Sequence, residues 1–186
     1  MERKIFQTFL WKLVEITARL VSGDPANEAT DVGPLIRASD AERVESWVRE
    51  AIESGAKLIA GGERNGSLMT PAILTASKPG MKIRDEEVFG PVVVVEPYDD
   101  FEEALAEVNR SKYGLQAGLL TRDAGRILTA YRELEVGALI VGDTPAWRLD
   151  PMPYGGVKDS GLGREGIRSA IEEMTEPRML VMSGLS

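Results

Sequence analysis

The sequence predicts an α/β fold built mostly from parallel βαβ units, and two observations support this prediction. Four consecutive valines, Val92–Val95, follow a Gly-Pro pair and are typical of a strand buried on both faces, as in a parallel sheet. Beyond residue 88, strand-like segments alternate with segments of helical periodicity. This alternation is the order that βαβ units produce.

The chain before the valine strand is expected to begin with two amphipathic helices. The first spans residues 3–21, where apolar residues recur at three- and four-residue spacing. The second begins near Ser39, which forms a capping-box pattern with Glu42, and it ends at Gly55. The remaining expected pieces are a strand over 57–60, a turn at 61–62 and an extended segment over 70–74.

The elements expected after the valine strand alternate in type. They are a helix capped by Asp99 or Asp100, a strand over 113–121, a helix over 123–134, a strand over 136–141, a helix over 164–174 and a closing strand over 179–182. A loop rich in Pro and Gly spans residues 143–163. Because no repeat, linker or low-complexity tract interrupts the chain, one domain is expected.

Composition excludes several classes of function. The 186 residues include no Cys and no His, which removes thiolate nucleophiles, Ser-His-Asp triads and zinc sites, and no metal site is expected. A net charge of −8 argues against a nucleic-acid or anionic-membrane partner. No apolar run has the length of a signal peptide or membrane span, so a cytoplasmic protein is expected.

One dinucleotide-binding pattern is rejected. Gly161–Gly166 matches G-x-G-x-x-G, but Lys158-Asp159-Ser160 precedes it where a strand is required. No acidic residue follows at the required distance of about twenty positions. These glycines are therefore expected to shape a tight loop before the last helix.

The best candidate site lies at the mouth of the valine strand. Ligand sites in open α/β sheets lie at strand ends, which is where Glu87 and Phe89 are expected. The alternative is that Glu86 and Glu87 are merely solvated while Phe89 anchors the core.

Three separated motifs together resemble the C-terminal part of NAD(P)-dependent aldehyde dehydrogenases. They are Glu86-Glu87-Val88-Phe89-Gly90-Pro91, Tyr113-Gly114-Leu115-Gln116-Ala117 and the run from Pro153 to Glu165. The resemblance covers nearly the whole chain. It implies that residues 1–175 form the C-terminal portion of the catalytic domain and that residues 176–186 form a terminal oligomerisation strand.

The resemblance also implies which parts of the catalytic machinery this chain lacks. In this family the nucleophilic Cys, the general-base Glu, the oxyanion-hole amide and the nucleotide-binding domain lie upstream of the matching region. The thiolate attacks the aldehyde, hydride passes to the nicotinamide, and water hydrolyses the thioester. Since the sequence contains no Cys, the chain alone is expected to be inactive.

By resemblance, four residues would contact the cofactor or substrate. Glu87 matches the residue that accepts hydrogen bonds from the nicotinamide ribose, and Phe89 matches an aromatic beside the nicotinamide. Binding of NAD or NADP by the chain alone is expected to be weak or absent. Trp147 and Arg148 match the aldehyde entry path, although an ordinary surface loop fits them equally well. Arg148 would suit a carboxylate-bearing aldehyde.

Several roles remain open at the level of sequence. The chain fits a component of an aldehyde dehydrogenase, either a fragment or one half of a split enzyme with an upstream half. It also fits a non-catalytic remnant or interaction module that forms homo- or hetero-oligomers with intact homologues through residues 179–182. A stand-alone small-ligand binder using Glu87 and the 153–166 loop is the third option. Neither the aldehyde nor the choice between NAD and NADP follows from these residues.

Overall fold

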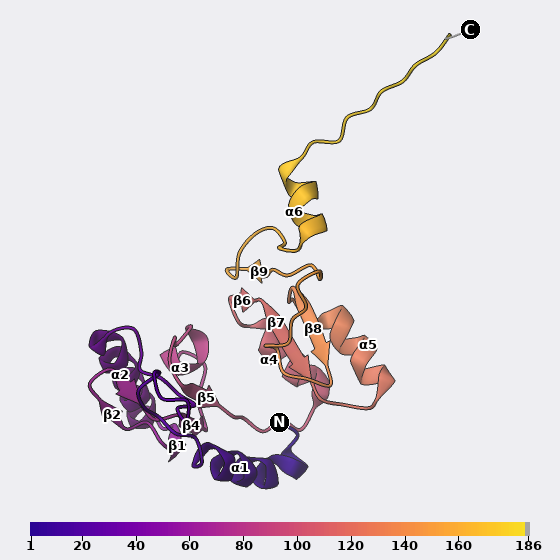
Figure 1. Ribbon diagram of the computed structural model, residues 1–186. Coiled ribbons are helices and arrows are strands. Elements are labelled where there is room, and N and C mark those ends of the chain that lie inside the picture. The colour runs from indigo at the N-terminus through magenta and orange to yellow at the C-terminus, as the bar shows by residue number, and fades with distance from the viewer. Residues whose placement is uncertain (185–186) are drawn as a thin grey trace. The chain divides into compact units, whose positions relative to one another are not determined.

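The computed structural model describes residues 1–184, which form two compact units. The first is Met1–Asp100 and the second begins at Phe101. Both units mix helices with strands (Figure 1), which confirms the predicted α/β class. The predicted division at residue 175 remains a prediction.

The first unit contains a three-stranded sheet and a small hairpin. Its elements are α1 (Arg3–Thr17), α2 (Ala38–Glu53), β1 (Lys57–Ala60), β2 (Arg64–Asn65), β3 (Leu68–Met69), β4 (Ala72–Thr75), α3 (Lys82–Asp85) and β5 (Val92–Val94). The sheet has the order β1-β4-β5, and β2 pairs with β3. β1 runs antiparallel to β4, whereas β4 and β5 are parallel and joined through α3. The β4–α3–β5 connection is a parallel unit that the sequence does not predict, because the predicted alternation begins only beyond residue 88.

The doubly buried strand of this sheet is β4 and not the valine strand. All four β4 residues are buried: Ala72 and Leu74 pack with α2, while Ile73 packs with Phe6 and Leu10 of α1. β5 is an edge strand in which Val93 is 43% exposed. The prediction that the valines are buried on both faces is therefore wrong. Within residues 1–184, β5 has a partner strand on one side only.

The second predicted helix forms, and its C-terminal end agrees with the prediction while its N-terminal end does not. α2 begins at Ala38 with Arg37 as its N-cap and no side-chain capping bond, so the capping box at Ser39 is wrong. Ser39 lies inside the first turn, two positions after the N-cap, where its side chain cannot act as a cap. Gly55 is confirmed as the terminator: it has φ +104°, and the amide of Ala56 donates to the carbonyl of Ala51 at 2.9 Å.

The second unit is organised around a parallel strand pair. Its elements are α4 (Phe101–Asn109), β6 (Tyr113–Gly114), β7 (Gln116–Leu119), α5 (Ala124–Glu133), β8 (Ala138–Val141), β9 (Val157–Lys158) and α6 (Ile167–Met174). β7 and β8 are parallel and connected through α5, which confirms one predicted βαβ unit. The unit predicted between the valine strand and the 113–121 strand does not form among the described strands, because β5 and β7 belong to different sheets. Asp123 caps α5 as predicted, accepting a hydrogen bond from the amide of Arg126 at 3.1 Å.

Two predicted segments of this unit differ from the structure. The strand expected over 113–121 is divided at Leu115, because β6 pairs antiparallel with β9 while β7 pairs with β8. Residues 179–182 form no strand within the chain, and their side chains are 67–86% exposed. A strand that pairs with another chain needs that chain, so the oligomerisation role of this segment stays a prediction.

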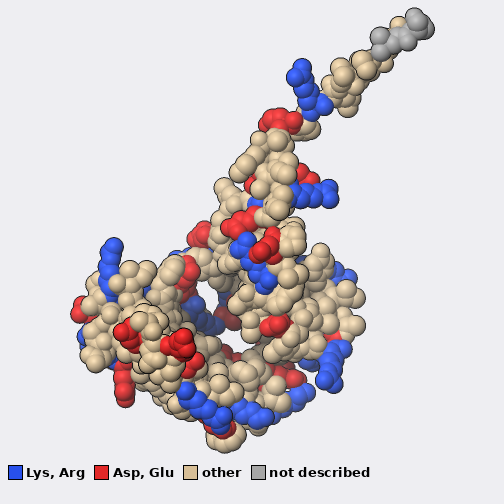
Figure 2. Space-filling model, viewed as in Figure 1, with Lys and Arg blue, Asp and Glu red and all other residues tan. Residues whose placement is uncertain are grey.

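Charged side chains of both signs are interspersed over the face of the molecule shown in Figure 2. Among residues 1–184, no helix is long and apolar enough to cross a membrane.

The packing of β4 leads to a stability prediction. Leu74 is fully buried in the cluster that α2 covers, so Leu74→Ala is expected to lower the free energy of unfolding by about 2–5 kcal/mol. Urea titration followed by circular dichroism measures this change. Ile36→Ala is the control, because Ile36 is exposed in the same unit and its loss should change the free energy by less than about 0.5 kcal/mol.

An ion pair that joins the start of α1 to the segment after β5 leads to a prediction about pH. The Arg3 Nε donates to both carboxylate oxygens of Asp99, at 2.7 and 2.8 Å. These hydrogen bonds are the main cause that holds the pKa of Asp99 below its ordinary value of 3.8. A carboxyl whose pKa is lowered by folding stabilises the fold above its unfolded pKa and loses that effect as the pH falls through the folded pKa.

Asp99→Asn is accordingly expected to lower the melting temperature slightly at pH 7. The difference from the parent chain should shrink as the pH falls below 3.8. Thermal melts at several pH values measure it, with Glu28→Gln as the control that removes one carboxylate from an exposed loop. A difference that grows on acidification would contradict the prediction.

Candidate functional site

Contacts with α2 fix the loop before β5, which carries Glu87 and Phe89. Arg43 on α2 donates from Nη2 to the carbonyl of Val88 at 2.8 Å, and its guanidinium lies 4.6 Å from the centre of the Trp47 ring. Gly90 sits so close to α2 that a Cβ there would lie 2.9 Å from Cγ2 of Val44. The backbone on both sides of Phe89 is therefore held in place.

Phe89 itself points outward in an unusual backbone conformation. Its side chain is 74% exposed and its φ is +47°, a left-handed value that bulky residues rarely adopt. The alternative in which Phe89 anchors the core is thus wrong. Glu87 is also exposed. The loop presents a carboxylate that can accept hydrogen bonds from hydroxyls, two residues from an aromatic ring that can pack against a flat group.

The loop after β8 carries the second predicted pair, Trp147 and Arg148. Gln116 of β7 fixes this loop, because its side-chain amide donates to the carbonyl of Pro145 at 2.6 Å. A Cβ at Gly118 would lie 2.9 Å from the carbonyl oxygen of Asp143, so the loop lies directly on β7. Both predicted residues remain exposed on an anchored loop.

Arg148 is held between an aromatic ring and a carboxylate. Its guanidinium lies 4.3 Å from the centre of the Tyr154 ring, and its Nη2 donates to Oε2 of Glu165 at 2.9 Å. Tyr154 and Glu165 in turn form an isolated antiparallel bridge. Gln116, Tyr154 and Glu165 lie in the motifs quoted from the sequence, but no individual contact of these residues was predicted. Their contacts join residues 17 or more positions apart, or follow from the bridge, which no local pattern reveals.

Lys158 fastens the segment between Tyr154 and Glu165 to the rest of its unit. Its Nζ donates to the carbonyl oxygens of Asn109 at 2.7 Å and Ser111 at 3.1 Å, and it lies 2.6 Å from Oε2 of Glu135. Lysine donors can satisfy the last carbonyls of a helix, as Lys158 does for Asn109, the last residue of α4. The segment that carries Tyr154 and Glu165, the two contacts of Arg148, is therefore held in place.

The rejected glycine pattern leads into a helix but follows the wrong kind of strand. The short strand β9 precedes it, although none was expected there, and β9 is antiparallel to β6. A dinucleotide fingerprint requires a strand of a parallel βαβ unit. Gly166, with φ +104°, is the N-cap of α6.

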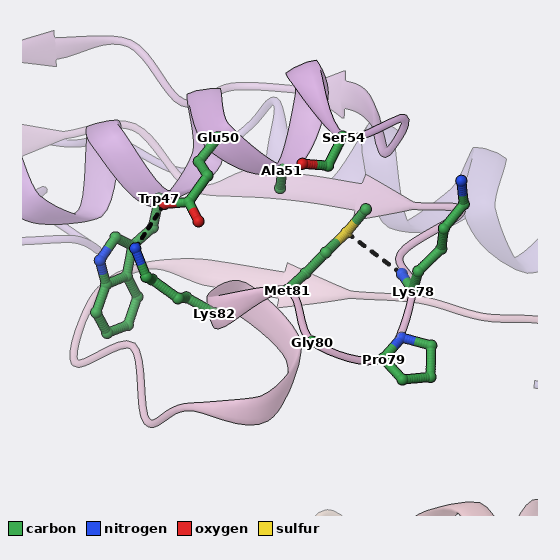
Figure 3. A pocket seen from close by; sticks show the side chains of 9 residues that line it. All are labelled: Trp47, Glu50, Ala51, Ser54, Lys78, Pro79, Gly80, Met81 and Lys82. Carbon is green, nitrogen blue, oxygen red and sulfur yellow. Dashed lines mark hydrogen bonds and ion pairs between the residues drawn. The ribbon is translucent and has the colours of Figure 1, made fainter.

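The two predicted pairs lie in different units, Glu87 and Phe89 in the first and Trp147 and Arg148 in the second. A pocket of about 280 Å³ in the first unit is separate from both pairs (Figure 3). α2 and the segment 78–82 line it, and across it the Nζ of Lys82 donates to Oε2 of Glu50 at 2.7 Å. No group of three or more potential metal-ligating side chains occurs within residues 1–184.

Comparison with known proteins identifies the relatives of this chain. The sequence profile of the aldehyde dehydrogenase family matches residues 1–180. A 3-sulfolactaldehyde dehydrogenase of Priestia aryabhattai is 53% identical over 96% of this chain, which corresponds to 38% of that protein. A lactaldehyde dehydrogenase of Methanococcus vannielii is 42% identical over 99% of this chain and 39% of its own length. The chain thus spans less than half the length of these relatives.

Solved structures give the same result for the fold. Aldehyde dehydrogenase 21 of Physcomitrella patens, in complex with the reaction product succinate, has a TM-score of 0.95 and 40% identity over 97% of this chain and 38% of its own. A glyceraldehyde-3-phosphate dehydrogenase of Methanocaldococcus jannaschii, complexed with NADP, has a TM-score of 0.88 and 39% identity over 93% of this chain and 38% of its own. The match of the family profile over residues 1–180 shows that this chain belongs to the aldehyde dehydrogenase family, whose members are NAD(P)-dependent oxidoreductases.

Proposed function

We propose that this chain is one part of an NAD(P)-dependent aldehyde dehydrogenase and that it contributes contacts to the nicotinamide and the substrate, while another segment supplies the nucleophile. The observation that carries the proposal is the anchored loop that exposes Glu87 and Phe89 within a family match over residues 1–180. The chain has no Cys, so the thiolate adduct from which hydride is transferred cannot form on it. The isolated chain is therefore inactive.

The exposed loop suits the nicotinamide end of NAD or NADP. The Glu87 carboxylate can accept hydrogen bonds from both hydroxyls of a ribose, because it has two oxygens and faces solvent. Phe89 offers an aromatic face beside it, and its strained φ of +47° is the kind of conformation that persists where function requires it. When bound, the cofactor would accept the hydride from the substrate.

The second unit supports an aldehyde that carries an anionic group. The planar guanidinium of Arg148 can bind a carboxylate, sulfonate or phosphate through paired hydrogen bonds. The names of relatives include 3-sulfolactaldehyde and glyceraldehyde-3-phosphate, and one solved relative holds succinate. Lactaldehyde, named for another relative, is neutral, so the proposal rests on Arg148 and not on the names.

A second candidate function is a non-catalytic module that assembles with intact homologues. It is favoured by residues 179–182, a run of apolar side chains that are 67–86% exposed. Such a segment can add a strand to the sheet edge of another chain.

A tagged pull-down from the native cells separates the two candidates. The component role predicts that a Cys-bearing dehydrogenase segment co-purifies and that the eluate produces NADH or NADPH from short aldehydes. Glu87→Gln should then raise the KM for the cofactor while the partner still co-purifies, because only a hydrogen-bond acceptor at the ribose is weakened. Recovery of intact dehydrogenases whose activity does not change with Glu87→Gln would favour the module.

The substrate class is tested in the same active eluate. Arg148→Met is expected to lower kcat/KM for succinic semialdehyde about tenfold, because a hydrogen bond between charged groups is lost at a half-exposed site. The value for propionaldehyde, which has no anionic group, should change little. Arg168→Met is the matched control, since Arg168 is an exposed arginine that pairs with Glu172 on α6. Equal losses for both aldehydes would contradict anion recognition by Arg148.

A further inference from the structure

Arg148 already has a counter-ion of its own. The Glu165 carboxylate lies at 2.9 Å on one edge of the guanidinium, and the Tyr154 ring covers one of its faces at 4.3 Å. Both edges on which a guanidinium binds a carboxylate with two hydrogen bonds include Nη2, the nitrogen that donates to Glu165, so a second carboxylate bound in this way would meet Glu165 at the same nitrogen. The side chain of Arg148 is 40% exposed and that of Glu165 is 65% exposed, which leaves the pair open to solvent and to solutes.

The backbone that carries this counter-ion is fixed. The amide of Glu165 donates to the carbonyl of Tyr154 at 2.6 Å, and the amide of Tyr154 donates back to the carbonyl of Glu165 at 3.1 Å. The neighbouring Arg164 donates from Nη1 to the carbonyl of Gly156 at 2.8 Å, and its amide donates to Glu173 at 2.7 Å. The backbone of Glu165 is therefore held in place, while its side chain, which is 65% exposed, reaches Arg148 from the surface.

We propose that Glu165 is a built-in competitor for the anion site at Arg148, so that an anionic ligand binds by displacing the Glu165 carboxylate from the guanidinium. This inference rests on the proposed role of Arg148 in recognising an anionic group. Glu165 acts through Arg148 and is a positioning residue. It keeps Arg148 stacked on Tyr154 in the absence of ligand, and it lowers the affinity for any anion that must replace it.

The size of the effect follows from the exposure of the pair. Ion pairs between exposed side chains are weak, and their loss changes an equilibrium about two- to fivefold. Removing the Glu165 carboxylate should therefore tighten binding of a dicarboxylate by about that factor. A larger gain is not expected, because solvent already competes for both groups.

The test is a titration of the full chain with succinate, followed by the side-chain ¹H–¹⁵N signals of its arginines. The Arg148 signal is identified by its loss in Arg148→Lys. Glu165→Gln is expected to lower the Kd of succinate about two- to fivefold. Glu165→Asp retains the charge but shortens the side chain, so it should also lower the Kd if direct contact with Arg148 is what matters.

A matched control separates this contact from a change in net charge. Glu172→Gln removes one carboxylate from α6, where Glu172 pairs with Arg168 and not with Arg148, and it should leave the Kd unchanged. If Glu165→Gln raises the Kd, or changes it no more than Glu172→Gln does, competition by Glu165 is wrong. The role of Arg148 itself fails separately: in that case succinate does not shift the Arg148 signal, in the parent chain or in Glu165→Gln.

Discussion

The packing of α2 against β4 is the interaction on which the Glu87–Phe89 loop depends. β4 is buried on both faces because α1 covers one side of it and α2 covers the other. The same turns of α2 that pack on β4 also carry Val44, against which Gly90 fits, and Arg43, which binds the carbonyl of Val88. Burial of a strand in the core thus sets the position of an exposed loop. Loosening the core would therefore free the Glu87–Phe89 loop. This holds although Glu87 itself is not part of the core.

In the second unit, too, the position of an exposed loop depends on the strands beneath it. The parallel pair β7–β8 places Gln116, whose amide fixes the loop that carries Arg148. Lys158 anchors the opposite side, where Tyr154 and Glu165 meet the guanidinium. Each contact is polar and partly exposed, so this arrangement is weaker than the apolar support of the first unit. Weak contacts of this kind suit the proposed exchange, in which the carboxylate of a ligand replaces that of Glu165 at Arg148.

Local chemistry made some features of the fold predictable from the sequence. The helices follow from apolar periodicity, the end of α2 from Gly55, and the start of α5 from Asp123. The parallel β7–α5–β8 unit was also predictable, because alternating elements have few other arrangements. These features depend on residues close together in the chain.

Features that depend on distant residues were not predictable. The run of valines is typical of a central strand, but β5 lies at the edge of its sheet. Whether a strand is central or at the edge depends on its neighbouring strands, which the local sequence does not reveal. Arg37 and not Ser39 is the N-cap of α2, and an arginine without a side-chain capping hydrogen bond gives no local signal for the start of a helix. For the candidate site, the resemblance pointed to Glu87, Phe89, Trp147 and Arg148, but the ion pair of Arg148 with Glu165 arises only when the bridge at Tyr154 forms. Two-residue strands such as β2 and β3 are too short to show an alternating pattern.

The exposure of Phe89 supports the proposal that the chain is one component of a binding site and not a complete binding protein. A left-handed backbone at a bulky residue is strained, and exposing 74% of an aromatic side chain to water is unfavourable as well. The packing of the first unit offsets neither the backbone strain nor the exposure of the ring, because the Phe89 ring belongs to neither core cluster. An outward-facing ring on an anchored loop is stabilised if a flat cofactor or another segment covers it. The strain at Phe89 therefore favours a surface that is completed by binding, in agreement with a chain that contributes to a site and does not contain all of it.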